Sequence, residues 1–128
     1  MKKAFIAVAV SLLFSSCVAF VPVVDVNSVP KEKMQEAYKV RTFTVDNGID
    51  HAKVAEYLGE VTAYSCKVLP TDPPASKGNA LLQLRLAALD KGANAVIDVT
   101  FDVRGTDAFG TNCWESVQAS GMAVKINQ

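Results

Sequence analysis

Hydrophobic and polar residues alternate along three stretches of the chain, and this alternation predicts half-buried β-strands. The stretches lie at residues 57–66, 95–103 and 116–126. A shorter β-prone stretch, residues 41–45, precedes them and ends at the turn signal Asp46-Asn47-Gly48. The pattern therefore predicts four strands.

The alternation also assigns the side chains of each strand to its two faces. In the stretch at residues 57–66, Val61 and Ala63 fall on one face and three polar or aromatic residues on the other: Glu60, Thr62 and Tyr64. In the stretch at residues 95–103, Asp98, Thr100 and Asp102 share a face, and four apolar residues share the opposite one: Ile97, Val99, Phe101 and Val103. We expect the apolar face of each strand to pack on the core.

A helix is predicted between the second and third strands, at residues 79–91, where leucine and alanine are too widely distributed for a narrow apolar stripe. Gly92 follows, where a left-handed residue would end the helix. A proline-rich loop at residues 70–74 precedes it, and a loop at 104–112 separates the last two strands. The expected fold is α+β: a small single domain of order β-β-α-β-β, with one helix packed on a mostly antiparallel sheet and one disulfide.

The N-terminus has a different pattern, typical of an export signal. Lys2 and Lys3 precede an apolar stretch at residues 4–14, which is too short to span a bilayer. The following residues, 13–17 (LFSSC), resemble a lipobox, so residues 1–16 are predicted as a lipoprotein signal peptide and Cys17 as the site of a covalent diacylglycerol and an N-acyl chain. An ordinary secretory signal, cleaved near Ser16 or Ala19, is the alternative.

Residues 17–39 are predicted to be the lipidated cysteine and a tether, with a short helix after Pro30, and residues 40–128 the globular domain. Val18 is not the aspartate that favours the inner membrane, so we expect the outer membrane, with the domain in the periplasm. Without Lys2 and Lys3 the chain has 11 basic and 13 acidic side chains. The basic residues are scattered, which argues against a nucleic-acid partner.

The remaining cysteines, Cys66 and Cys113, are an even pair, which in an oxidising compartment predicts a disulfide. A metal site is the alternative, although the two thiols lack the paired CxxC spacing of zinc ligands and His51 is the only histidine. The acidic residues close enough in sequence to assist are Asp98, Asp102, Asp107 and Glu115. We expect no metal and no cofactor besides the lipid.

Sequence motifs of catalysis are scarce, and the chain is not expected to be an enzyme. The single histidine would leave acid-base chemistry to carboxylates, and Asp98 and Asp102 lie about 13 Å apart along a strand, too far for a direct dyad. The sequence contains neither a GxSxG elbow nor a glycine-rich phosphate loop. Trp114, beside Cys113, is either a recognition aromatic or packing against the disulfide.

Several short motifs, in their order and spacing, resemble the RcsF-like family of outer-membrane stress-sensor lipoproteins. They are residues 41–44 (RTFT), 57–61 (YLGEV), 65–66 (SC), 72–74 (DPP), 93–96 (ANAV), Cys113 and 121–126 (GMAVKI). That family has two disulfides, and lining up the segments places Phe101 and Ala119 where its second cysteine pair lies. An apolar contact between Phe101 and Ala119 on neighbouring strands would fill that space. The family's long basic, proline-rich linker is replaced here by about 20 residues, which reach roughly 70 Å when extended.

The resemblance implies a sensor that acts by changing its protein partners. Envelope damage would let the domain reach an inner-membrane regulator of an Rcs-type phosphorelay, and outer-membrane barrel proteins or their assembly machinery are further implied partners. The candidate contact surfaces are the loops at residues 46–48, 71–74 and 104–112. Two alternatives remain: a periplasmic metal or small-ligand binder like the YbjQ-type small domains, and a structural lipoprotein without a signalling role.

Overall fold

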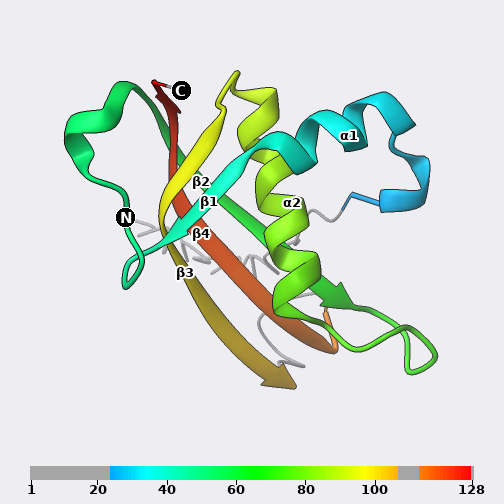
Figure 1. Ribbon diagram of the computed structural model, residues 1–128. Coiled ribbons are helices and arrows are strands. Elements are labelled where there is room, and N and C mark those ends of the chain that lie inside the picture. The colour runs from blue at the N-terminus through cyan, green and yellow to red at the C-terminus, as the bar shows by residue number, and fades with distance from the viewer. Residues whose placement is uncertain (1–23, 107–112, 128) are drawn as a thin grey trace, which may run out of the picture.

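Four strands form one mixed sheet in the order β1-β3-β4-β2, with helices α1 and α2 on one of its faces (Figure 1). The computed structural model describes residues 24–106 and 113–127. The strands are β1 (Arg41–Thr44), β2 (Val54–Lys67), β3 (Ala95–Thr106) and β4 (Glu115–Ile126). β1 runs parallel to β3, and β4 is antiparallel to both β3 and β2. The expected α+β fold with a mostly antiparallel sheet is confirmed.

The helices are α1 (Lys31–Lys39) and α2 (Lys77–Asp90), and two short 3-10 turns lie at Val26–Ser28 and His51–Lys53. α2 begins two residues earlier than predicted because Ser76 caps it: the Ser76 Oγ accepts the Asn79 N–H at 3.1 Å. The helix ends at Asp90, one residue before the predicted Lys91, which is its C-cap. Gly92 has φ +79°, and it donates its N–H to the Leu89 carbonyl at 2.9 Å.

The main core lies between α2 and the sheet. Leu84 of α2 is fully buried, as are Val96 of β3 and Ala119 of β4. Val61 and Ala63 of β2 face the same core, as the alternation predicts, and Glu60 and Thr62 are exposed on the other side. Burial of such side chains contributes about 1.5–3 kcal/mol each for the larger aliphatic residues, so this face holds α2 in place.

α1, which lies in the segment predicted as a tether, packs against α2. Its residue Ala37 is fully buried, and Lys33 Nζ of α1 lies 2.8 Å from Asp90 Oδ1 of α2. Val40, directly after α1, is 2% exposed and belongs to the main core. The ordered domain therefore includes residues before position 40.

A β-bulge at Asp98 breaks the alternation predicted for β3. Ile97 pairs with Met122 and Thr100 with Ser120, so Asp98 and Val99 together oppose one residue of β4, Gly121. Asp98 has φ +54°, a left-handed conformation that aspartate adopts more readily than most residues.

The prediction that Ile97 shares a face with Val99 is wrong, because the extra residue reverses the alternation. Val99 and Phe101 face α2, whereas Ile97 faces the other side of the sheet and packs in a second, smaller cluster with Phe43 and Val124. Val103 is 62% exposed rather than buried. The first residue of α2, Lys77, has its Nζ over the Phe101 ring, 5.6 Å from the centroid. Because β3 continues from Phe101 to Thr106, it extends beyond the N-terminal end of α2.

Within residues 24–106 and 113–127, no helix is long and apolar enough to span a bilayer.

Candidate functional site

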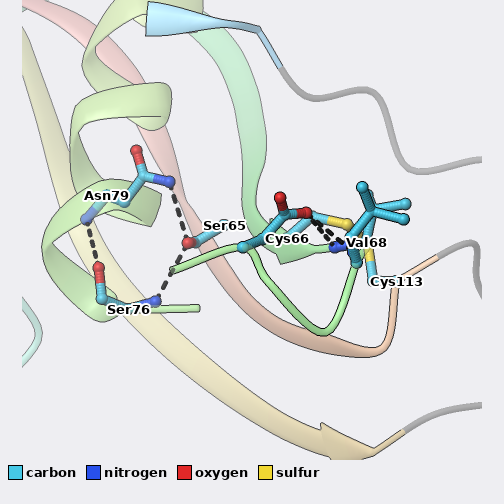
Figure 2. The surroundings of a disulfide bond; sticks show 8 residues. Ser65, Cys66, Val68, Ser76, Asn79 and Cys113 are labelled. Atoms are coloured by element: carbon cyan, nitrogen blue, oxygen red, sulfur yellow. Dashed lines mark hydrogen bonds between the residues drawn. A yellow bond between two sulfur atoms is a disulfide. The ribbon is translucent and has the colours of Figure 1, made fainter. Parts of the chain in front are cut away.

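A disulfide between Cys66 and Cys113 joins the end of β2 to the residue that lies two positions before β4 (Figure 2). The Cys113 side chain is buried, with 2% of its area exposed. Beside it, the Trp114 N–H donates to the Lys67 carbonyl at 2.6 Å, which continues the β2–β4 ladder past the two strand ends. The predicted disulfide is confirmed, and because both sulfur atoms are bonded to each other, neither thiol is a metal ligand.

The loop between β2 and α2 is held by hydrogen bonds at both of its ends. At its start, the Asp72 carboxylate accepts the backbone N–H groups of Val68 at 3.1 Å and Leu69 at 2.8 Å. This loop contains the predicted contact segment at residues 71–74, so its conformation is fixed by Asp72 as well as by its prolines.

At the far end of the same loop, the buried hydroxyl of Ser65 joins β2 to the start of α2. Ser65 Oγ accepts the Ser76 N–H at 3.1 Å and the Asn79 Nδ2–H at 3.0 Å. Figure 2 shows Ser65 pointing toward Ser76 and Asn79, next to the disulfide at Cys66. The disulfide and the hydroxyl that holds the start of α2 thus lie on adjacent residues of β2, Cys66 and Ser65.

Exposed apolar side chains gather at this end of the sheet. We call Val68, Leu69 and Trp114 the disulfide-end patch; their exposed fractions are 51%, 56% and 51%. The Trp114–Lys67 hydrogen bond places Trp114 next to the strand end that leads into Val68. Trp114 is interpreted from the sequence either as a recognition aromatic or as packing against the disulfide, and about half of its area is open to solvent. Half-exposed Trp side chains are common where a protein binds another protein.

A cluster of titratable side chains lies on the face of the sheet away from α2. It was not predicted from the sequence, in which His51 appeared isolated. The His51 Nδ1 lies 3.0 Å from the Tyr57 Oη, and its Nε2 lies 3.7 Å from Asp98 Oδ2. All three side chains are about half exposed. Beside them is a shallow hollow of about 210 Å³, lined by Glu60, Asp98, Thr100, Ser120, Gly121 and Met122. The bulge at Asp98 directs its carboxylate toward His51, and no sequence motif marks such a bulge.

The acidic residues considered for a metal site are not brought together. Asp102 is paired with Arg104 at 2.9 Å, and Asp98 lies near His51. Glu115 pairs in register with Lys67 at the other end of the sheet, and Asp107 lies outside the described residues. In the described part of the chain, no group of three or more His, Cys, Asp or Glu side chains is arranged to hold a metal ion.

Two further loops were predicted as contact surfaces, at residues 46–48 and 104–112. The turn at residues 46–48 is exposed and follows β1, where the Asn47 N–H donates to Thr44 Oγ1 at 3.3 Å. The loop predicted at residues 104–112 begins later than expected, because β3 continues to Thr106; its residues 107–112 lie outside the described residues, as does Cys17 with the predicted signal peptide.

Comparison of the chain with protein-family models and with curated proteins found no match.

Proposed function

We propose that this protein is an RcsF-like envelope-stress sensor: an outer-membrane lipoprotein anchored through Cys17 whose periplasmic domain contacts an inner-membrane regulator of a phosphorelay. The export signal and the lipobox-like residues 13–17 support the anchor. The Cys66–Cys113 disulfide supports an oxidising compartment. A sensor of this kind needs no chemistry of its own, only a surface that a partner can bind.

The observation that carries the proposal is the position of the disulfide-end patch. The Cys66–Cys113 bond fixes the residue before Trp114, and the Trp114–Lys67 hydrogen bond fixes the backbone of Trp114 itself. A rigid, half-exposed aromatic loses little conformational entropy on binding, which is why tryptophan often contributes most to the affinity of an interface. The proposed contact with the regulator is therefore made by Val68, Leu69 and Trp114.

The anchor is tested by the intact mass of the protein extracted from membranes, before and after reduction with thiol alkylation. We expect the mass of residues 17–128 plus a glyceride and acyl chains, and two thiols that become reactive only after reduction. Cys17→Ser should move the protein to the soluble periplasmic fraction. An unacylated product, cleaved elsewhere, would overturn the anchor.

The signalling role is tested with a transcriptional reporter of an Rcs-type phosphorelay, in cells that express the chain in place of their own sensor. Trp114→Ala should abolish most of the stress-induced signal, because it removes the centre of the proposed contact. Tyr38→Ala is the matched control, since Tyr38 is an aromatic of α1 that is 60% exposed and far from the patch in sequence. Equal signals from both variants at equal protein levels would contradict the proposed surface.

A further inference from the structure

The side chain of Gln83 in α2 holds the backbone of Val24, near the N-terminal limit of the described residues. Gln83 Oε1 accepts the Val24 N–H at 3.3 Å, and Gln83 Nε2 donates to the Val24 carbonyl at 2.7 Å. The same pair of bonds would join two residues in a β-ladder. Because the Val24 side chain is 48% exposed, the recognition is of the peptide backbone. We call this contact the Gln83 clamp.

The clamp matters energetically because the Gln83 side chain is buried, with only 5% of the residue exposed. The two hydrogen bonds to Val24 satisfy both its amide oxygen and its amide nitrogen. If Val24 left, a buried donor and a buried acceptor would lose their partners, and each such loss is destabilising unless another group replaces the partner. The site is therefore built to hold an extended backbone.

The clamp lies in a groove of about 180 Å³ between the N-terminal segment, the helices and β2. Val24 forms one wall of this groove, and the rest of its apolar lining comes from Val29 before α1, Ala63 of β2, and Leu86 and Ala87 of α2. The ion pair between Lys33 of α1 and Asp90 of α2 lies at its rim. β2 is also an edge strand of the sheet. A groove with an apolar lining and one buried amide fits an extended, apolar peptide.

We propose that this groove is a binding site for an extended apolar peptide backbone, that its occupant is the chain's own segment at Val24, and that the Gln83 clamp sets the length of the membrane tether. The proposal rests on the proposed function, because a tether exists only if Cys17 is anchored. Val24 already occupies the site, and the residues just before it, 18–23 (VAFVPV), are apolar.

The consequence is a change in reach. With the clamp closed, Val24 lies seven positions after Cys17, which is about 25 Å of extended chain. With the clamp open and the 3-10 turn at Val26–Ser28 unwound, the first residue of α1 becomes the nearest fixed point, and Lys31 lies 14 positions after Cys17, which extends to about 50 Å. Opening the clamp would thus roughly double the distance at which the domain can meet a partner.

The first test measures hydrogen exchange at the Val24 amide in the purified full mature chain. Gln83→Leu should raise its exchange rate about tenfold, because it replaces the amide that accepts this N–H with an apolar side chain of similar size. Gln35→Leu is the matched control, since Gln35 is an exposed residue of α1. Unchanged exchange in Gln83→Leu would overturn the clamp.

The second test uses a fluorescent peptide of residues 18–29 as the probe. Val24→Pro removes the donated N–H and should vacate the groove, so that the labelled peptide binds this variant in an anisotropy titration and binds the unaltered chain at least tenfold more weakly. Adding Gln83→Leu to Val24→Pro should abolish the binding. Equal binding with and without Gln83→Leu, or no binding to Val24→Pro, would contradict the proposal. Both tests use purified protein and no signalling readout, so they fail or succeed separately from the stress-sensor proposal.

Discussion

Phe101 and Ala119 lie directly opposite each other on β3 and β4, the two central strands of the sheet. Both side chains contact the main core beneath α2. Directly opposed residues in antiparallel strands have Cα atoms about 4.5–5.5 Å apart, within the range that a disulfide spans. The double variant Phe101→Cys/Ala119→Cys should therefore form a second disulfide without movement of the backbone, as the resemblance to the RcsF-like family predicts. Peptide mapping of the non-reduced protein would identify the new bond.

The control for this second disulfide is Thr100→Cys/Ala119→Cys. Thr100 pairs with Ser120 and faces the side of the sheet away from α2, so its side chain points away from that of Ala119. We expect free thiols at these two positions. A bond in the control, or scrambling of Cys66–Cys113 in the test variant, would show that the register of β3 and β4 differs from the one described.

Loss of the Cys66–Cys113 bond should lower the free energy of unfolding by about 4 kcal/mol. The bond joins residues 47 positions apart and so restricts the conformations that the unfolded chain can adopt. Cys66→Ser/Cys113→Ser tests this value in a urea titration, and it avoids the reactive thiol that a single substitution would leave. The reduced unaltered protein should unfold at the same urea concentration as the double variant. Unfolding of all three forms at one concentration would contradict the stabilising role.

Gly121→Ala should destabilise the domain by about 1–3 kcal/mol through overpacking. A Cβ at Gly121 would lie 2.6 Å from Val96 Cγ1 and 2.9 Å from the Ile97 carbonyl oxygen, because the β3 bulge crowds this position. Gly78→Ala is the matched control: a Cβ there meets nothing within 4 Å, and alanine favours the helix. The midpoint temperature of thermal unfolding should therefore fall for Gly121→Ala and stay level or rise for Gly78→Ala. A fall of the same size in both variants would contradict the described bulge.

Ser65→Ala should cost about 1–3 kcal/mol of stability, because the Ser76 N–H and the Asn79 side-chain amide would lose their acceptor in a buried site. Ser120→Ala provides the comparison, since its hydroxyl makes only longer contacts, 3.3 Å to the Thr62 hydroxyl and 3.5 Å to Gln118 Nε2. Urea titrations of the two variants should differ by at least 1 kcal/mol. Equal stabilities would mean that Ser65 does not hold the start of α2.

The parts of the fold predicted from sequence are those governed by local signals. Alternation identified β2 and placed Val61 and Ala63 on the core, and Gly92 marked the end of α2 because a positive φ there favours glycine. The disulfide followed from two cysteines and the expected compartment. These signals act within a few residues, or through a pairing with a single possible partner.

The parts that could not be predicted depend on distant contacts. The bulge at Asp98 arises where β3 passes Gly121 of β4. Neither residue interrupts the alternating pattern of its own strand, so the sequence contains no local signal for the bulge. His51 acquires its neighbours Tyr57 and Asp98 only because the segment after β1 folds onto the sheet. The Gln83 clamp likewise joins residues 59 positions apart. Pattern analysis of one sequence does not detect pairings of this kind.

The strand order has a consequence for how the molecule is made. β1 pairs with β3 and β2 pairs with β4, so no described strand before residue 95 has a ladder partner before residue 95. A chain that emerges N-terminus first cannot begin a single strand pairing until Ala95 is available to pair with Arg41. Cys66 must also wait for Cys113. Folding is therefore a late event, and the ladder between β2 and β4 is complete only when Ile126 is available.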